Sequence, residues 1–244
     1  MTFRTVGFLV LVSLCFSAKL PNSFQKCNRK QPDLKDCLLK AAQDGLSQLA
    51  QPVLKDLMPS INPIEIPEAT IKEGQGAVEF QQSFKDCKIY GFHLVKLDAF
   101  DWNFEKKTLY MGGFYPEFKI HCHYDFVGKI LVVPIEGSGQ SRITMENVTS
   151  YMNLGYEETK KKGKTYVKFV SSEATLEPGL ISFNFDNLFD GDKLLGDNVN
   201  KLLNENWKEV FEDVKGGYVD LIRQVFTSIV NSLFSKVSLE ELLD

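Results

Sequence analysis

The chain has 244 residues, of which 43% are apolar, 12% aromatic and 25% charged, and its formal net charge is −4. This balance predicts one ordinary globular domain, or two small ones, with ample material for a core, and it argues against an intrinsically disordered chain. A nucleic-acid-binding protein usually carries a basic surplus or stripe, so the composition also argues against a nucleic-acid partner.

The first 18 residues have the features of a secretory signal peptide. Arg4 precedes an apolar run over Val6–Phe16, which is followed by the small pair Ser17-Ala18. A membrane-spanning helix needs about 20 apolar residues, and this run is too short. We therefore expect a signal peptide over 1–18, a secreted and extracellular single domain over 19–244, and no stable membrane anchor.

Removal of the leader changes the cysteine count from five to four, because Cys15 lies within it. An even number of cysteines in an exported protein predicts two disulfides. Cys27 and Cys37 lie ten residues apart with Pro32 between them, so a bridge between them closes a short local loop. Asn147-Val148-Thr149 is the single N-glycosylation sequon, and it predicts a glycan on Asn147.

The segment from Asp33 to Leu57 carries apolar residues at helical spacing. Asp33 follows a proline and is a plausible N-cap, because its carboxylate can accept bonds from free backbone N–H groups. Pro52 should end or kink this helix near Gln51.

From about Ile64 to Phe185 the pattern is typical of β-structure. Between Phe118 and Phe126 every second residue is apolar and the intervening residues are polar, which predicts a strand with one buried face. Successive strands separated by short polar tips, such as Glu105-Lys106-Lys107 and 160–164, predict an antiparallel meander. Alternating β–α units are absent from the sequence pattern, which disfavours a doubly wound fold.

The strand register around the hairpin tip at Lys106 indicates whether Cys87 and Cys122 can form the second disulfide. Antiparallel partners around this tip have residue numbers that sum to about 212, and Cys87 with Cys122 gives 209. Bulges at Gly91 and Gly112-Gly113 could absorb the offset. We therefore predict the bridges Cys27–Cys37 and Cys87–Cys122.

Apolar residues spaced three and four apart continue from Leu195 to Val237. These 43 residues predict a helix about 64 Å long, and hence an elongated molecule. The weak point is Gly216-Gly217, where two shorter helices could meet instead. A long apolar helix beside an extended antiparallel sheet predicts that the sheet curves around the helix, and such a seam can enclose a ligand tunnel.

Motifs for catalysis, nucleotide binding and zinc binding are missing from the sequence. His121, His123 and Asp125 share one strand face and could bind a metal, but the strand pattern already requires polar residues there, so we interpret them as a solvated face. His93 is isolated. We therefore expect neither catalytic residues nor a metal, and no cofactor.

The run Lys160-Lys161-Lys162-Gly163-Lys164 could attract anionic lipid or another acidic surface. We favour a solvated hairpin tip instead, because the mature chain is acidic and its sequence shows no wider basic field.

Several segments resemble the insect takeout family, which includes the haemolymph juvenile hormone binding proteins. The similarity is carried by 187–197, by Leu203-Asn204-Glu205-Asn206-Trp207-Lys208-Glu209-Val210-Phe211, by the Cys27 and Cys37 pair and by 128–139. It covers essentially all of the mature chain.

The resemblance implies an α+β fold in which a strongly curved antiparallel sheet wraps a long C-terminal helix around an apolar tunnel. It also implies a secreted carrier of juvenile hormone, another terpenoid or a fatty acid, a link to circadian rhythm, and a disulfide between Cys27 and Cys37. The Cys87–Cys122 pair departs from many members and rests on the register argument alone.

Our leading interpretation is a monomeric secreted carrier of a small hydrophobic ligand, and not an enzyme. The alternatives are a secreted interaction or signalling protein that acts through an unidentified receptor or a membrane and, with less support, a lipid esterase. The candidate ligand-binding residues are apolar side chains expected on the inner faces: Trp102, Phe104, Phe118, Ile120, Phe169, Phe183, Phe185, Trp207, Phe211 and Phe226.

Overall fold

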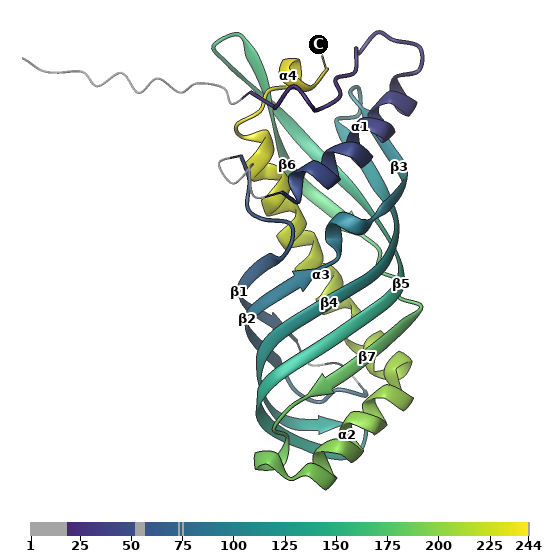
Figure 1. Cartoon of the computed structure of the whole chain (residues 1–244), viewed down its shortest axis with the longest axis vertical. Helices are drawn as coiled ribbons and strands as arrows, with labels where there is room; N and C mark the ends of the chain where they lie inside the picture. Colours follow the sequence, from purple (N-terminus) through teal and green to yellow (C-terminus); the bar gives the residue numbers. More distant parts are fainter. Residues whose placement is uncertain (1–18, 52–56, 73, 75, 244) are drawn as a thin grey trace, which may run out of the picture.

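The computed structural model describes residues 19–51, 57–72, 74 and 76–243, so the expected leader over 1–18 lies outside the described residues. The molecule is elongated, and a curved antiparallel sheet lies against helix α3 (Trp207–Phe234), which runs obliquely along it (Figure 1). The fold class predicted from the sequence, α+β with a curved antiparallel sheet and a long C-terminal helix, is confirmed.

The sheet is built around two very long strands, β4 (Thr108–Ile130) and β5 (Val133–Lys161), which form one hairpin. Two strands pair in succession along the free edge of β4, namely β3 (Lys96–Asn103) and β2 (Gln82–Tyr90), and β1 (Ile64–Ile71) pairs with β2. The free edge of β5 pairs with β6 (Lys164–Ala174) and β7 (Leu180–Phe185). The sheet therefore has an upper half with β3 and β6 and a lower half with β1, β2 and β7 (Figure 1).

The buried face of the two long strands changes parity at the junction of these halves. Apart from the glycine at 112, the buried positions of β4 are odd-numbered up to Tyr115, whereas after Phe118 they are even-numbered. The buried positions of β5 are odd-numbered before Asn147 and even-numbered after it. Pro116, which has no N–H to donate, lies opposite Asn147, whose φ is +53°. The paired residue numbers sum to 263 on both sides of this point, so the two strands change their buried face together without a shift in register.

Both predicted disulfides, Cys27–Cys37 and Cys87–Cys122, are present. The paired residue numbers sum to 211 at the start of the β3–β4 ladder, to 210 past Gly112-Gly113 and to 209 in β2 beyond Gly91. Gly91 has a φ of +96° and precedes the short 3-10 turn η2 (Phe92–Leu94), which separates β2 from β3. The register argument for Cys87–Cys122 is therefore confirmed, with the offset located at the predicted glycines.

The prediction of one continuous C-terminal helix over 195–237 is wrong. Helix α2 (Lys193–Glu205) and α3 are separated by Asn206, whose φ of −116° and ψ of 23° interrupt the helical path, and a last short helix α4 (Leu239–Leu243) follows α3. The break is not at Gly216-Gly217, which lies inside α3. A Cβ atom on Gly217 would lie 2.8 Å from Ile71 Cγ2, so this glycine allows close contact between α3 and β1.

Helix α1 (Leu34–Leu49) begins at the predicted residue and ends just before the predicted proline break. The prediction that the Asp33 carboxylate caps it is wrong, because that side chain accepts no capping bond. The Gln43 amide instead fastens α1 to the sheet: it donates to the Val95 carbonyl at 2.9 Å and accepts from Leu97 N–H at 2.8 Å.

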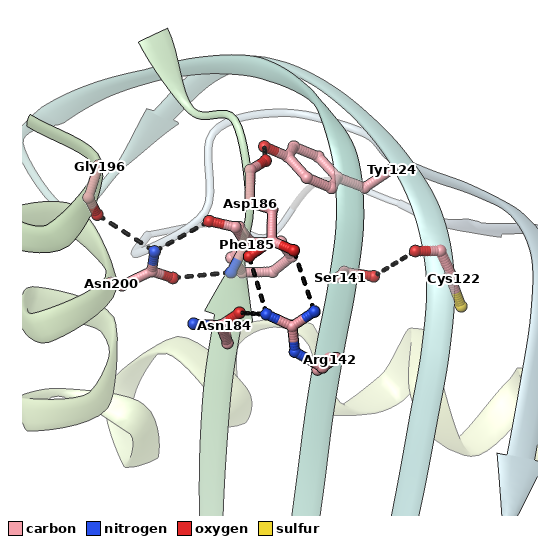
Figure 2. Close-up of polar contacts among 9 residues, drawn as sticks. All are labelled: Cys122, Tyr124, Ser141, Arg142, Asn184, Phe185, Asp186, Gly196 and Asn200. Carbon is pink, nitrogen blue, oxygen red and sulfur yellow. Dashed lines mark hydrogen bonds and ion pairs between the residues drawn. The ribbon is translucent and has the colours of Figure 1, made fainter. Parts of the chain in front are cut away.

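Asparagine amides fasten the other helices to the outer edges of the sheet in the same way. Asn200 and Asn204 of α2 each bond both the N–H and the carbonyl of a β7 residue, Phe185 and Phe183, at 2.7–2.9 Å. Asn231 of α3 bonds Phe169 of β6 identically, at 2.8 and 2.9 Å. Figure 2 shows the Asn200 contacts. An asparagine side chain thus replaces the missing neighbouring strand.

A second group of polar contacts ties β4, β5 and β7 together beside Asn200 (Figure 2). Arg142 forms a bidentate pair with the Asp186 carboxylate at 2.9 and 2.8 Å. The Tyr124 hydroxyl donates to the Asp186 carbonyl. Burial, and then the negative charge of Asp186, raise the pKa of Tyr124 to about 12, so this hydroxyl remains a donor.

Candidate functional site

The sheet and α3 enclose an apolar cavity, here called the lower cavity, of about 1120 Å³ including its open side. Residues of β1, β2, β4, β5 and α3 form its wall, and Leu176 and Phe92 complete it. The disulfide Cys87–Cys122 lies in this wall and joins β2 to β4.

A second apolar cavity, the upper cavity, has a volume of about 1070 Å³ including its open side. Its wall consists mainly of α1, the second half of α3, the segment 20–27 and α4, with a few residues from β3 and β4. The regularly spaced apolar residues of α1 therefore form part of a cavity wall as well as part of the core.

The two cavities share three wall residues, Phe92, Met111 and Phe226, here called the partition. The Phe92 and Phe226 rings lie 5.7 Å apart, and the Phe92 ring is 5.9 Å from that of Tyr115. The two cavities are therefore adjacent at three residues whose apolar side chains can rotate.

Polar groups are few in the lower cavity. The polar side chains among its lining residues are those of Tyr115, Ser150 and Tyr218, and the Ser150 hydroxyl donates to the Thr175 carbonyl at 2.7 Å. The Tyr218 hydroxyl has a long contact, 3.4 Å, with the Gln82 amide oxygen. Burial raises the pKa of both tyrosines well above the usual value, so both hydroxyls are neutral donors.

Among the described residues, neither cavity wall includes a charged side chain. Such walls favour an uncharged ligand, because an ion moved away from water would have no partner there. A neutral oxygen acceptor could receive a bond from Tyr115, or from Tyr218 if it replaced the long contact with Gln82.

Aromatic side chains close the far end of the lower half; we call this group the aromatic plug. The Phe126 ring lies within 5.3 Å of four others, and Phe84 belongs both to the plug and to the cavity wall. The plug consists of Phe80, Phe84, Tyr124, Phe126 and Phe185.

Four of the ten candidate ligand-binding residues lie on a cavity wall: Phe118 and Ile120 on the lower, Trp102 on the upper, and Phe226 on both. The other six are packed elsewhere in the structure. Phe169, Phe183, Phe185 and Phe211 are buried core residues, Trp207 packs partly buried against the core, and Phe104 stacks on Trp102 beneath the Arg29 guanidinium.

The sequence did not point to Phe92, Tyr115 or Tyr218 as wall residues. For Tyr115 the strand pattern was misleading: extrapolated back from Phe118–Phe126, it places odd-numbered residues outside. The signal that could have corrected this is Pro116, because a proline within a strand indicates an edge or a bulge.

His121, His123 and Asp125 lie exposed on the outer face of β4, as the interpretation as a solvated face requires. His123 contacts Gln140, and the His121 ring lies 5.5 Å from that of Tyr90. The described residues contain no group of three or more His, Cys, Asp or Glu side chains placed to hold a metal ion. His93 lies half-buried in η2.

Helices long and apolar enough to cross a bilayer are absent from the described part of the chain. A curved sheet and a helix around uncharged cavities define the class of proteins that bind hydrophobic molecules internally. Residues 6–244 match the family model of the haemolymph juvenile hormone binding proteins, and the chain belongs to this family. The predicted family is therefore confirmed, and its members bind small hydrophobic ligands.

Individual relatives extend over nearly the whole chain. The "Circadian clock-controlled protein daywake" of Drosophila melanogaster is 26% identical over 251 residues, which cover 98% of this chain and 95% of the relative. Its Drosophila yakuba counterpart is 25% identical over 248 residues, with coverage of 97% and 94%. The crystal structure of Epiphyas postvittana Takeout 1 superposes with a TM-score of 0.79 at 23% identity, covering 90% of this chain and 99% of that one, and supports the fold.

Proposed function

We propose that this protein is a secreted carrier that holds one extended hydrophobic molecule in the two cavities, and that it is not an enzyme. The observation that carries the proposal is that two apolar cavities share Phe92, Met111 and Phe226, three residues with rotatable apolar side chains. A ligand that displaced Phe92 or Met111 from the partition would occupy a continuous tunnel. Burial of about 400 Å² of apolar ligand surface offers roughly 10 kcal/mol before the costs of association.

The ligand classes supported are juvenile hormone, other terpenoids and fatty acids. Uncharged walls and two neutral tyrosine donors favour the neutral members, such as an isoprenoid ester or epoxide, over a carboxylate buried in the lower cavity. An isoprenoid acid and its methyl ester form a matched pair of probes. We expect the ester to bind at least tenfold more tightly at pH 7.5.

The direct test is native mass spectrometry of protein purified from its own source, followed by extraction and identification of the bound molecule. We expect an adduct, and we expect hydrophobic competitors to displace a fluorescent fatty-acid probe. Protein without an adduct that binds neither the fatty-acid probe nor the isoprenoid ester would refute carriage.

Two variants locate the ligand. Ile222→Trp fills the lower cavity and Ala41→Trp fills the upper one, and each should weaken binding of a probe that spans both by at least tenfold. The control is Val170→Trp, because Val170 is 52% exposed and lies outside both walls. Equal affinity of all three variants would place the ligand elsewhere.

Export and glycosylation complete the proposal. The leader over 1–18 supports secretion, and Asn147 lies exposed at the position where β5 changes its buried face. Expression in insect cells should yield a chain that begins near Lys19 and loses mass on treatment with an N-glycosidase. Secreted protein that still carries residues 1–18 would contradict the cleavage of the leader. An Asn147→Gln variant with the same glycan mass as the parent chain would contradict glycosylation at Asn147.

A further inference from the structure

Positive charge collects at one end of the molecule, although the chain as a whole is acidic. Four segments meet there: residues 26–36, 103–108, 157–168 and 236–241, together called the basic end (Figure 1). They contain 12 lysines and arginines against seven aspartates and glutamates, a net charge of +5. The remaining described residues contain 14 against 22, a net charge of −8.

A closed ring of contacts shows that the four segments form one surface. Lys26 pairs with Glu241 at 3.3 Å, and the Glu240 carboxylate accepts from Thr165 N–H at 2.9 Å. Lys107 pairs with Glu158 at 3.6 Å, and the Arg29 guanidinium lies 5.6 Å from the centre of the Phe104 ring. The expectation that no wider basic field accompanies the run at 160–164 is therefore wrong, since the fold brings distant cations beside it.

Many of these cations are available to a partner. Lys106 and Lys160 are exposed and Lys164 is half-exposed, and within the described part of the chain none of the three forms an ion pair. The basic end therefore keeps a positive surplus after its internal pairs are counted.

The basic end also lies over the upper cavity. Leu242 and Leu243 of α4 line that cavity, while Glu240 and Glu241 of the same helix hold the ring of contacts together. At the opposite end of the molecule the aromatic plug is packed as buried core. An apolar ligand that crosses water loses about 25 cal/mol for each Å² exposed, so the favourable place for exchange is an end held against a bilayer.

We propose that the basic end docks on an anionic lipid bilayer, with the upper cavity facing the membrane. Lipid headgroups are favoured over other polyanions because the positive surface and the end of an apolar cavity coincide. Docking does not require the carrier function, although exchange of ligand at the membrane rests on it.

Flotation of the mature chain with vesicles tests the docking. We expect binding to vesicles of 70% phosphatidylcholine and 30% phosphatidylserine, little binding to pure phosphatidylcholine, and loss of binding as salt is raised. The triple variant Lys106→Gln, Lys160→Gln, Lys164→Gln should bind about a hundredfold more weakly, because each lysine near such a surface contributes about fivefold.

A matched control changes the net charge equally at the other end. Lys129, Lys193 and Lys201 lie in the β4–β5 turn region and α2, and the triple glutamine variant of these residues should bind within about twofold of the parent chain. Equal weakening by both triple variants would show a net-charge effect and overturn the proposal. So would absence of vesicle binding at low salt, or binding to a sulfated polysaccharide but not to vesicles.

A transfer measurement separates this proposal from the carrier function. A preloaded fluorescent fatty acid should pass to vesicles faster as the phosphatidylserine fraction rises, and the basic-end variant should lose this dependence. Probe affinity in the absence of vesicles should be unchanged in that variant. Vesicle binding without any probe binding would support docking and refute the carrier function. A transfer rate independent of the phosphatidylserine fraction would overturn the proposal that the upper cavity faces the membrane.

Discussion

The lower and upper cavities have similarly apolar walls that are held together by different interactions. Four hydrogen-bonded strands and one disulfide form most of the lower wall. The upper wall consists mainly of helices and the segment 20–27. The helices are attached to the sheet through side chains such as Gln43, Asn231 and Glu240, and the Cys27–Cys37 bridge joins the segment 20–27 to α1. Since walls without strand pairing open at lower free energy, the lower cavity should set the fixed part of the site and the upper cavity the adaptable part.

Removal of each disulfide gives the largest test of this difference. The double variant Cys87→Ala, Cys122→Ala should lower the free energy of unfolding by about 4 kcal/mol, and Cys27→Ala, Cys37→Ala by about 3 kcal/mol, because the first bridge closes the longer loop. Urea unfolding measures both. A larger loss from the Cys27–Cys37 pair would mean that the upper wall contributes more to stability than we infer.

The asparagine contacts provide a smaller test in each half. Asn204→Ala leaves an N–H and a carbonyl of β7 without their partner, and Asn231→Ala does the same in β6, so each should cost about 1–3 kcal/mol. Thermal unfolding measures the loss. Asn153→Ala, on the exposed face of β5, is the control and should change stability by less than about 0.5 kcal/mol. An Asn204→Ala protein as stable as this control would show that water replaces the amide without cost.

The partition determines whether the cavities act together. Phe92→Ala removes the ring shared by both walls, so it should increase affinity for an 18-carbon fatty acid relative to a 10-carbon one by several-fold. Competition against a fluorescent probe measures the ratio. Leu94→Ala, a neighbouring exposed residue, is the control. An unchanged ratio would show that a ligand already passes the partition, or that it occupies one cavity only.

The last expected effect is a pH dependence at the upper end. Burial disfavours ionisation of Glu240, but hydrogen bonds from Thr165 to its carboxylate outweigh burial and lower the pKa to about 2. The unfolded chain binds this proton at a higher pH, so the stabilisation is present above about pH 4.5 and is lost as the pH falls toward 2. The stability difference between the parent chain and Glu240→Gln should shrink over this range in urea titrations, whereas a constant difference would contradict the assignment.

Strand positions, the disulfide register and the start of α1 could be predicted because each depends on local patterns. The alternation in Phe118–Phe126 and the polar hairpin tips fix the β4 register, and with it the Cys87–Cys122 bridge. Most of the cavity wall could not be predicted in this way. Alternation shows which side chains point inward, and Phe185 and Phe118 fit this pattern equally well. Tertiary packing decides that Phe185 belongs to the aromatic plug and Phe118 to the wall of the lower cavity.

The position of the helix break illustrates a second limit. The apolar spacing continues through Asn206, and helix propensity is lowest at Gly216-Gly217. The helix is nevertheless interrupted at Asn206. Asn206 forms a side-chain bond to the Leu202 carbonyl, and the break lets α2 leave the line of α3 to contact β7. Gly217 is required instead for its small size beside Ile71. Tertiary contacts therefore outweighed helix propensity at both positions.

The asparagine amides that attach the helices to the sheet also prevent strand pairing between separate molecules. An exposed outer edge of β6 or β7 would present unpaired N–H and carbonyl groups to any other strand, which is the usual beginning of edge-to-edge aggregation. Asn200, Asn204 and Asn231 occupy those groups with side chains that cannot extend the ladder further. The helices thereby terminate a sheet that could otherwise continue from one molecule into the next.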